Sequence, residues 1–328
     1  MKWLVLAVLL ALALGAATES PGARRIPEAV DISGKELLPL THWASANGLE
    51  IRWLKRDETL QLSNRSTKIV LTVDSREAQL NGIEVWLLFP VVQRNGTVYL
   101  SQLDLQTTLQ PIIAPPKNRP GAYIKSVCLD PGHGGKDPGN LLGSNQEKKF
   151  TLLLALELRE QLTRAGIKAT LTRATDTFIE LPTRPELAKR RNADVFISLH
   201  FNAFAQNSVR GAEVYCLTPA GASSTNARGE GGGAGWFAGN HCNEKNMFLA
   251  YQMQKALTKN LAVEDRGLKR ARYAVLRDAV MPAVLIEGGF MSNPAEGRKI
   301  FDAAYRKQMA RAIVEGLLAY KRTVEGTG

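Results

Sequence analysis

The chain has 328 residues, of which 45% are hydrophobic and 22% are charged, so it can bury a core in two domains and is not a disordered protein. Lysine and arginine total 42 against 31 acidic residues, a formal net charge of +11, which excludes a strongly cationic target. The basic residues are scattered, with no run of roughly five or six, so we expect no nucleic-acid partner. The three cysteines, Cys128, Cys216 and Cys242, exclude a disulfide framework, and a bridge between Cys216 and Cys242 stays open.

The first 17 residues have the layout of a secretory signal peptide. Lys2 precedes an apolar run from Trp3 to Leu14, and small residues follow from Gly15 to Ala17. The alternative is a membrane anchor, but a spanning helix needs about 20 apolar residues, and this run is shorter. We therefore predict a signal peptide at 1–17 and an exported protein, in a periplasm or in the cell wall and outside the cell, without a stable membrane anchor.

We predict that residues 30–112 form a small α+β module, which would attach the protein to the wall or to a partner. A short helical pattern spans Leu37 to Ala46, and Leu103 to Leu109 predicts a closing helix. Between them lie β-rich runs separated by turn signals such as Asn81-Gly82. These runs are Leu49–Leu54, Leu60–Leu62, Lys68–Val73, Gln79–Leu88 and Thr97–Leu100. The module has no catalytic cluster of His, Asp or Glu, and its histidine, His42, is interpreted as a packed residue.

Three prolines between Ile112 and Pro120 mark a domain boundary, with a linker at 113–120 and a second domain at 121–322. In that domain strands alternate with helices, which predicts an α/β fold with a mostly parallel sheet flanked by helices. The expected strands are Val127–Leu129, Lys168–Thr172, Asp194–Leu199, Gly211–Leu217, Tyr273–Leu276 and Pro282–Ile286, with a turn at Arg266-Gly267. The expected helices are Glu147–Ala165, Pro182–Arg191, Met247–Leu261 and two between Pro294 and Tyr320.

A glycine-rich loop after the first of these strands presents one histidine, His133. The stretch Lys125 to Asn140 reads KSVCLDPGHGGKDPGN, and its prolines and glycines end the strand abruptly. Such a loop either cradles a phosphate or presents a metal ligand. It contains neither G-x-G-x-x-G nor G-x-x-x-x-G-K-[ST], the patterns that phosphate cradles use. We therefore favour a metal-ligand loop.

Three more polar residues occupy comparable places. His200 ends the apolar strand DVFISL, Glu287 directly follows the apolar strand PAVLI, and Glu147 begins the helix after the His133 loop. Each residue alone has a plain structural explanation, since a histidine can pack in a core and a glutamate can complement a helix dipole. Because open α/β sheets bind ligands at the carboxyl ends of their strands, we expect all four side chains to converge.

Two histidines and one carboxylate with an open fourth position form a catalytic zinc site. A second carboxylate can then act as general base on the metal-bound water, whose pKa the ion brings towards about 7. His241, in a glycine-rich insertion from Thr218 to about Asn246, is a weaker candidate ligand or acid, because mobile segments support ligands poorly. An insertion of this length is usually a functional rim or lid.

The motifs of this domain closely resemble the zinc-dependent N-acetylmuramoyl-L-alanine amidases of the type 3 family. They are LDPGHGGKDPG, the Glu147 helix start, R…A..RNADVFISLHFNA from Arg184 to Ala203 and PAVLIEGGFMSNP from Pro282 to Pro294. The resemblance implies a phosphorylase/hydrolase-like fold and cleavage of the amide between N-acetylmuramic acid and L-alanine in peptidoglycan, for wall remodelling or daughter-cell separation. By motif, His133, Glu147 and His200 would bind Zn²⁺ and Glu287 would be the catalytic glutamate. Gly288 stands where many relatives have Thr.

The same resemblance bears on partners. Periplasmic septal members of the family carry a helix in the region of the insertion, which covers the metal until an activator protein moves it. The insertion of this chain shows no amphipathic helix, which argues against that form of inhibition, although an activator remains a candidate partner. The N-terminal module resembles the copper amine oxidase-like N-terminal module, without the residues that would hold copper.

Two other functions stay open. One is a different zinc amidohydrolase of the same architecture, such as a carboxypeptidase, which would release single amino acids from the wall. The other is a wall-binding protein whose catalytic site has decayed. The presence of His133, Glu147, His200 and Glu287 together argues against decay.

Overall fold

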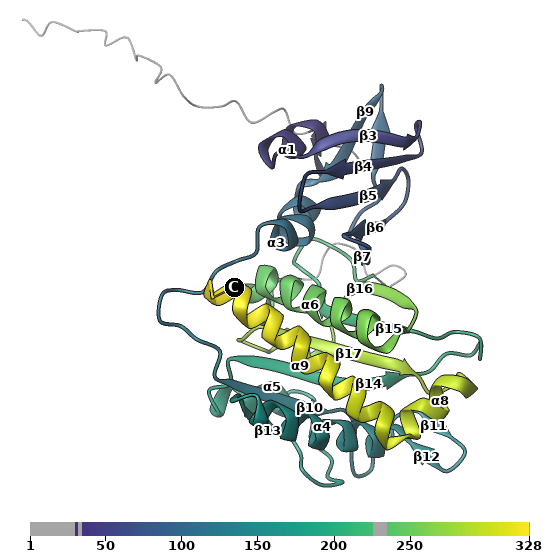
Figure 1. The fold of residues 1–328 in the computed structure, drawn as a ribbon, viewed down its shortest axis with the longest axis vertical. Coiled ribbons are helices and arrows are strands. Elements are labelled where there is room, and N and C mark those ends of the chain that lie inside the picture. Colours follow the sequence, from purple (N-terminus) through teal and green to yellow (C-terminus); the bar gives the residue numbers. More distant parts are fainter. Residues whose placement is uncertain (1–29, 32–34, 226–234, 328) are drawn as a thin grey trace, which may run out of the picture.

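The computed structural model describes residues 30–31, 35–225 and 235–327. The predicted signal peptide at 1–17 lies outside these residues. The N-terminal part and the α/β part lie at opposite ends of the molecule and are joined by one long sheet (Figure 1). No helix within the described ranges is long and apolar enough to cross a membrane.

The N-terminal part is built from short antiparallel strands and helical turns. A meander runs through β3 (Glu50–Lys55), β4 (Thr59–Ser63), β5 (Lys68–Thr72), β6 (Glu77–Leu80) and β7 (Ile83–Trp86). A separate sheet has the order β1 (Val30–Asp31), β2 (Glu36–Pro39), β9 (Thr97–Ser101) and β8 (Val92–Arg94). The helical segments are α1 (Leu40–Ala46), α2 (Gln102–Asp104), the π-helical turn η1 (Leu105–Leu109) and α3 (Gln110–Ile113).

Several predictions for this part need correction. The helix expected from Leu37 begins only at Leu40, because residues 37–39 are extended and pair with β9. The turn predicted at Asn81-Gly82 is confirmed, since it joins β6 and β7 in a hairpin. Asn81 and Gly82 both have positive φ, 50° and 82°, as a tight hairpin turn requires. His42 is exposed on α1 rather than packed.

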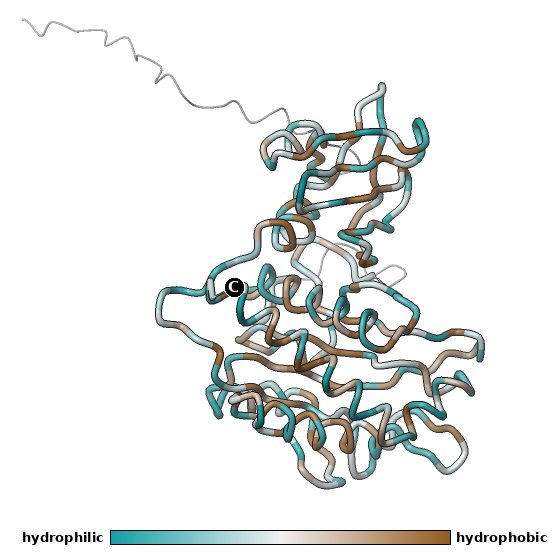
Figure 2. The backbone as a smooth tube through the Cα atoms, viewed as in Figure 1, coloured by the Kyte–Doolittle hydropathy of each residue, from teal (hydrophilic) through white to brown (hydrophobic). Residues whose placement is uncertain are grey.

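The α/β part has a mixed sheet between two layers of helices. Its strand order is β13 (Lys168–Leu171), β10 (Ser126–Pro131), β14 (Val195–Asn202), β17 (Ala283–Phe290), β15 (Ala212–Leu217) and β16 (Asp265–Ala271). Neighbouring strands are parallel except β15 and β17, which are antiparallel. A small hairpin, β11 (Leu141–Leu142) with β12 (Asn145–Gln146), precedes the first long helix. Hydrophobic residues line the strands in the middle of the sheet (Figure 2).

Helices cover both faces of this sheet. One face packs against α4 (Glu147–Arg164), α6 (Asn243–Leu261) and α9 (Ala303–Glu325), which lie in front of the strands in Figure 1. The other face has a smaller core that includes residues of α5 (Thr183–Arg190) and α7 (Ala274–Arg277). The remaining segments are η2 (Ala238–Cys242) and α8 (Pro294–Phe301).

Two predictions around β16 were wrong. Tyr273–Leu276 was expected to be a strand, but Ala274–Arg277 is the short helix α7. Arg266-Gly267 was expected to be a turn, but both residues lie inside β16, where the pairing with β15 shifts register. Gly267 has a φ of 82°, so the glycine forms a bulge that lets the strand continue.

The two parts share one continuous sheet and core, which the sequence did not indicate. Leu268 of β16 pairs in parallel with Val85 of β7, which produces an 11-stranded sheet. The fully buried Arg270 also ties them together, because its Nη1 donates to Leu217 O at 3.1 Å and its Nη2 donates to Thr107 O at 2.5 Å. The N-terminal part is therefore docked firmly on the α/β part.

Replacing Arg270 by Met should destabilise the whole chain by about 2–4 kcal/mol, because two buried carbonyls lose a charged donor. The measurement is the free energy of unfolding in urea. The matched control is Arg65→Met, at an exposed position, which should be nearly neutral. Equal stability of the two variants would contradict this account of the docking.

Candidate metal centre

His133, Glu147 and His200 meet at the carboxyl end of the parallel strands. Each offers a ligand atom, and these atoms all lie within 4.8 Å of one another. Glu147 is the central member, because its Oε2 lies 3.0 Å from His133 Nε2 and its Oε1 lies 3.0 Å from His200 Nδ1. His133 comes from the loop after β10, Glu147 begins α4 and His200 belongs to β14. The convergence expected from the sequence is thus present in the fold.

Two glycines of the His133 loop make this approach possible. A Cβ on Gly132 would lie 2.2 Å from the His200 ring, and a Cβ on Gly139 would lie 2.6 Å from His133 Cδ2. Such distances are far below van der Waals contact, so any side chain at either position would push the imidazoles apart. His133 itself has a φ of 61°, a left-handed conformation that few non-glycine residues adopt.

Residues that the sequence analysis did not single out orient the cluster. The Nδ1 of His133 lies 2.8 Å from Asp137 Oδ2 and donates to it, which turns Nε2 toward Glu147. Glu147 Oε2 accepts from the backbone N and the side-chain Nδ2 of Asn140, at 2.9 and 3.0 Å. Glu147 Oε1 accepts from Phe201 N at 3.1 Å. The signal for Asp137 was present in the sequence, as a carboxylate four residues after the histidine.

These contacts determine the charge of Glu147. Burial raises the pKa of its carboxyl group, but hydrogen bonds with the two imidazoles outweigh burial and hold the pKa far below its usual value. For His133, burial disfavours the charged form, while hydrogen bonds to Glu147 and Asp137 raise the pKa overall. The cluster therefore presents an ionised carboxylate between two nitrogen ligands, a donor set that suits a divalent cation.

Two buried arginines hold the backbone of the His133 loop. Arg184 donates to His133 O at 2.9 Å and forms a buried ion pair with Asp130, also at 2.9 Å. Arg173 donates to Gly132 O at 2.7 Å. Both also donate to Pro131 O. Since these carbonyls accept hydrogen bonds from buried arginines, the backbone of the His133 loop is held in its left-handed conformation.

Glu287 stands beside the cluster on the neighbouring strand. It lies opposite His200 in the pairing of β14 with β17, and its Oε2 is buried without a hydrogen-bond partner among the described residues. Burial, followed by repulsion from Glu147 and Glu213, raises the pKa of Glu287 well above its usual value. A buried carboxylate oxygen with no protein partner, next to two imidazoles and a carboxylate, fits a site that takes a cation and its water.

These residues share a cavity of about 300 Å³. Its lining residues are His133, Gly139, Asn140, Glu147, Leu181, His200, Tyr273, Ala274, Val275, Leu285 and Glu287. Leu181 and Tyr273 are exposed and form part of its rim.

Gly288, beside the candidate catalytic residue, has a packing explanation. A Cβ at this position would lie 2.8 Å from Met309 Sδ and 3.1 Å from Phe201 Cε1. Met309 is fully buried on α9. The methionine thus occupies the space that a side chain at 288 would need, behind the strand that carries Glu287.

His241 lies away from the cluster. It is exposed in η2, and its ring contacts that of Trp236 at 5.2 Å between centroids. It lines a different cavity, together with residues such as Gln106 of the N-terminal part and Lys117 of the segment that follows it. All three cysteines are free, so Cys216 and Cys242 do not pair.

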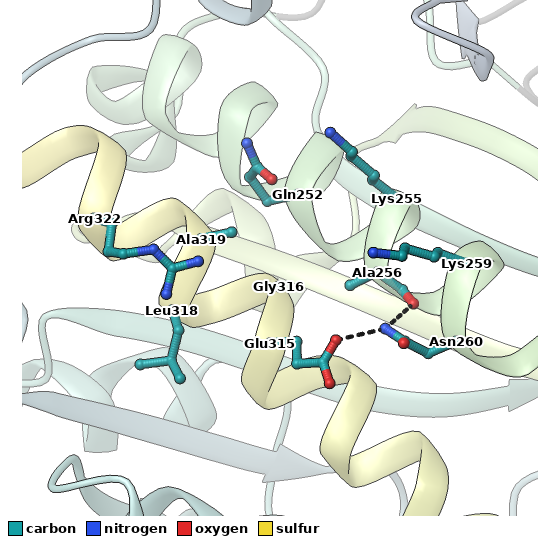
Figure 3. A pocket seen from close by; sticks show the side chains of 10 residues that line it. All are labelled: Gln252, Lys255, Ala256, Lys259, Asn260, Glu315, Gly316, Leu318, Ala319 and Arg322. Atoms are coloured by element: carbon teal, nitrogen blue, oxygen red, sulfur yellow. Dashed lines mark hydrogen bonds between the residues drawn. The ribbon is translucent and has the colours of Figure 1, made fainter. Parts of the chain in front are cut away.

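A further groove, of about 380 Å³, lies between α6 and α9 (Figure 3). Lys255, Lys259 and Arg322 line it, together with Glu315, which accepts a hydrogen bond from Asn260 at 2.8 Å. Its lining has no histidine or cysteine and shares no residue with the cluster. The chemistry therefore belongs to the cavity at the strand ends.

The fold and the cluster define an α/β domain with a candidate metal centre at the carboxyl ends of its strands. Residues 127–319 match the family model described as N-acetylmuramoyl-L-alanine amidase. The match spans more than half of the chain, so the chain belongs to this family and is an amidase of peptidoglycan. Residues 26–113 match the model described as copper amine oxidase N-terminal domain.

Curated relatives agree with this assignment. The chain is 34% identical over 229 residues to the N-acetylmuramoyl-L-alanine amidase AmiA of Escherichia coli, which covers 62% of this chain and 79% of that protein. It is 35% identical over 220 residues to AmiC of Neisseria meningitidis, which covers 60% of this chain and 53% of that protein.

Solved structures share the α/β fold. An N-acetylmuramoyl-L-alanine amidase from Clostridium difficile matches with a TM-score of 0.51 and 32% identity, over 61% of this chain and 97% of that one. AmiC2 of Nostoc punctiforme matches with a TM-score of 0.51 and 32% identity, over 61% and 98%. The CwlD amidase of Clostridioides difficile, solved in complex with the GerS lipoprotein, matches with a TM-score of 0.51 and 29% identity, over 60% and 98%.

Asp137→Ala should weaken binding of a divalent metal by about 10- to 100-fold, because His133 loses the partner that fixes its orientation. Competition between the protein and a chromophoric chelator for Zn²⁺ measures the affinity. Asp278→Ala, at an exposed aspartate after α7, is the control and should leave the affinity unchanged. An Asp137→Ala affinity equal to that control would show that the contact does not orient the ligand.

Proposed function

We propose that this amidase is zinc-dependent, that His133, Glu147 and His200 bind the ion, and that Glu287 is the catalytic glutamate. The bond cleaved is the amide between N-acetylmuramic acid and the L-alanine of the stem peptide. The observation that carries the proposal is the unpaired Glu287 carboxylate oxygen beside an ionised Glu147 and two imidazoles.

Zinc in such a site supplies a Lewis acid and lowers the pKa of a bound water. Glu147, held by Asn140 and Phe201, keeps the two histidine nitrogens facing one point. Glu287 takes a proton from the attacking water and returns it to the nitrogen of the departing stem peptide. Its raised pKa suits this role, because such a carboxylate accepts a proton readily.

The place of action follows from the proposed substrate. We propose that residues 1–17 are a signal peptide and that the enzyme acts in the periplasm or cell wall, in wall remodelling or daughter-cell separation. We also propose that 30–112 is an attachment module, 113–120 a linker and 121–322 the catalytic domain. A binding partner comparable to that of the CwlD amidase is a candidate for this chain.

Digestion of purified sacculi tests the function directly. The protein should release whole stem peptides that begin with L-alanine, and a chelator should abolish the release. Single amino acids as products would indicate a carboxypeptidase instead. Binding to sacculi without any product would indicate a wall-binding protein.

Glu287→Gln should keep its zinc and lose roughly 100-fold or more of its turnover, because the proton transfers lose their carboxylate. Stem-peptide release gives the rate, and elemental analysis gives the zinc content. A Glu287→Gln protein as active as the original would remove Glu287 from the catalytic role.

His133→Ala should instead lose zinc, since one of the nitrogen ligands is gone. Elemental analysis after dialysis measures the metal content. His42→Ala, at the exposed histidine of α1, is the matched control and should retain a full complement. Full zinc in His133→Ala would exclude this residue as a ligand.

A further inference from the structure

A second buried glutamate, Glu213, lies directly beside Glu287 and has no role in the proposed reaction. In the antiparallel pairing of β15 with β17, Glu213 is opposite Glu287. Directly opposite residues of an antiparallel pair project from the same face of the sheet, with Cβ atoms about 4.5–5.5 Å apart. Glu213 is only 2% exposed. Two carboxyl groups so close in a buried place would repel each other unless one is compensated.

Glu213 is the compensated one. Its Oε1 accepts from Asn202 Nδ2 at 2.9 Å and from Tyr215 Oη at 2.8 Å. Its Oε2 accepts from Arg266 Nε at 3.2 Å and from Lys269 Nζ. Burial raises the pKa of Glu213, but the charge and hydrogen bond of Lys269, the hydrogen bond from Tyr215 and the charge of Arg266 together lower the pKa overall. Glu213 is thus an ionised carboxylate with each oxygen occupied by donors.

Glu287 has the opposite environment. Its Oε2 lacks a hydrogen-bond partner in the described part of the chain. The charged groups that act on it are Glu147 of α4, Glu213 of β15 and Lys269 of β16. The side chains of Asn202, Tyr215, Arg266 and Lys269 already donate to Glu213. The hydrogen-bond donors around the two glutamates therefore bind Glu213 and not Glu287 Oε2.

Lys269 is the cation that would compete for Glu287 if Glu213 were absent. Its side chain is only 7% exposed, so it needs a counter-charge inside the protein. Glu213 supplies that charge. The positive charge of Lys269 also acts on Glu287 and on Glu84 of β7. Without Glu213, the lysine could pair with either of them.

We propose that Glu213 is a positioning residue for the amidase reaction, because it holds Lys269 and the neighbouring donors and so leaves the Glu287 carboxylate unpaired and facing the attacking water. This inference rests on the proposed catalytic role of Glu287. Glu213 touches neither substrate nor metal in this scheme. It acts through what it keeps away from Glu287.

The first test is Glu213→Gln. The amide keeps the volume of the side chain, but it is neutral and has one acceptor oxygen instead of two, so it no longer supplies the counter-charge of Lys269. Lys269 should then pair with Glu287, and kcat for stem-peptide release should fall roughly 10- to 100-fold, less than on loss of Glu287, because the base is occupied rather than removed. KM and the zinc content should stay unchanged. The matched control is Glu264→Gln, at an exposed glutamate that also pairs with Arg266, and it should keep full activity.

The second test is rescue. Adding Lys269→Met to Glu213→Gln removes the competing cation, so kcat should return to within about threefold of the original enzyme, a strong coupling between the two positions. A role in folding alone would lower the free energy of unfolding or the zinc content of Glu213→Gln, whereas the proposed role lowers kcat in a folded, zinc-loaded protein. If Glu213→Gln alone does not fold, the double variant carries the test, because replacing both members of a buried ion pair is often tolerated.

Two results would overturn the inference. One is full activity in Glu213→Gln. The other is a folded, zinc-loaded double variant that stays as inactive as Glu213→Gln. Neither of these results touches the proposed function, which fails separately if Glu287→Gln remains active or if the original enzyme releases no stem peptides.

Discussion

The site depends on one buried carboxylate, Glu147, placed between two imidazoles. Removing this group from water is costly, and hydrogen bonds from His133, His200, Asn140 and Phe201 offset that cost. The carboxylate stays ionised and draws together the loop after β10, the start of α4 and the end of β14. Glycines at 132 and 139 then decide how closely the rings approach.

The buried carboxylates near the site are paired with cationic side chains, except for Glu287. Asp130 pairs with Arg184, and Glu213 pairs with Lys269 and Arg266. Each of these carboxylates fixes a segment, the His133 loop in the first case and the strand beside Glu287 in the second. Glu287 alone among these acids has an oxygen without a partner in the described chain. The free oxygen of Glu287 is available to react with a bound water. Asp130 and Glu213, whose oxygens all have partners, have structural roles instead.

The α/β fold and the convergence of His133, Glu147, His200 and Glu287 could be predicted from the sequence. The reason is that a polar residue directly after an apolar strand is easy to recognise in a sequence. It did not predict what depends on contacts between distant segments. Gly267 resembled a turn, yet β16 continues through it because β15 and β7 supply partners on both sides. Likewise, three prolines indicated a boundary, while Arg270 and the shared sheet hold the two parts together.

Anomalous X-ray scattering at the zinc absorption edge, from crystals of the zinc-loaded protein, would locate the ion. If the three residues bind zinc, one peak should lie about 2.0–2.2 Å from His133 Nε2, His200 Nδ1 and a Glu147 carboxylate oxygen. The peak should also leave room for a water within reach of Glu287. A zinc peak elsewhere in the chain, or Glu147 turned away from both imidazoles in the loaded protein, would contradict zinc binding by these residues.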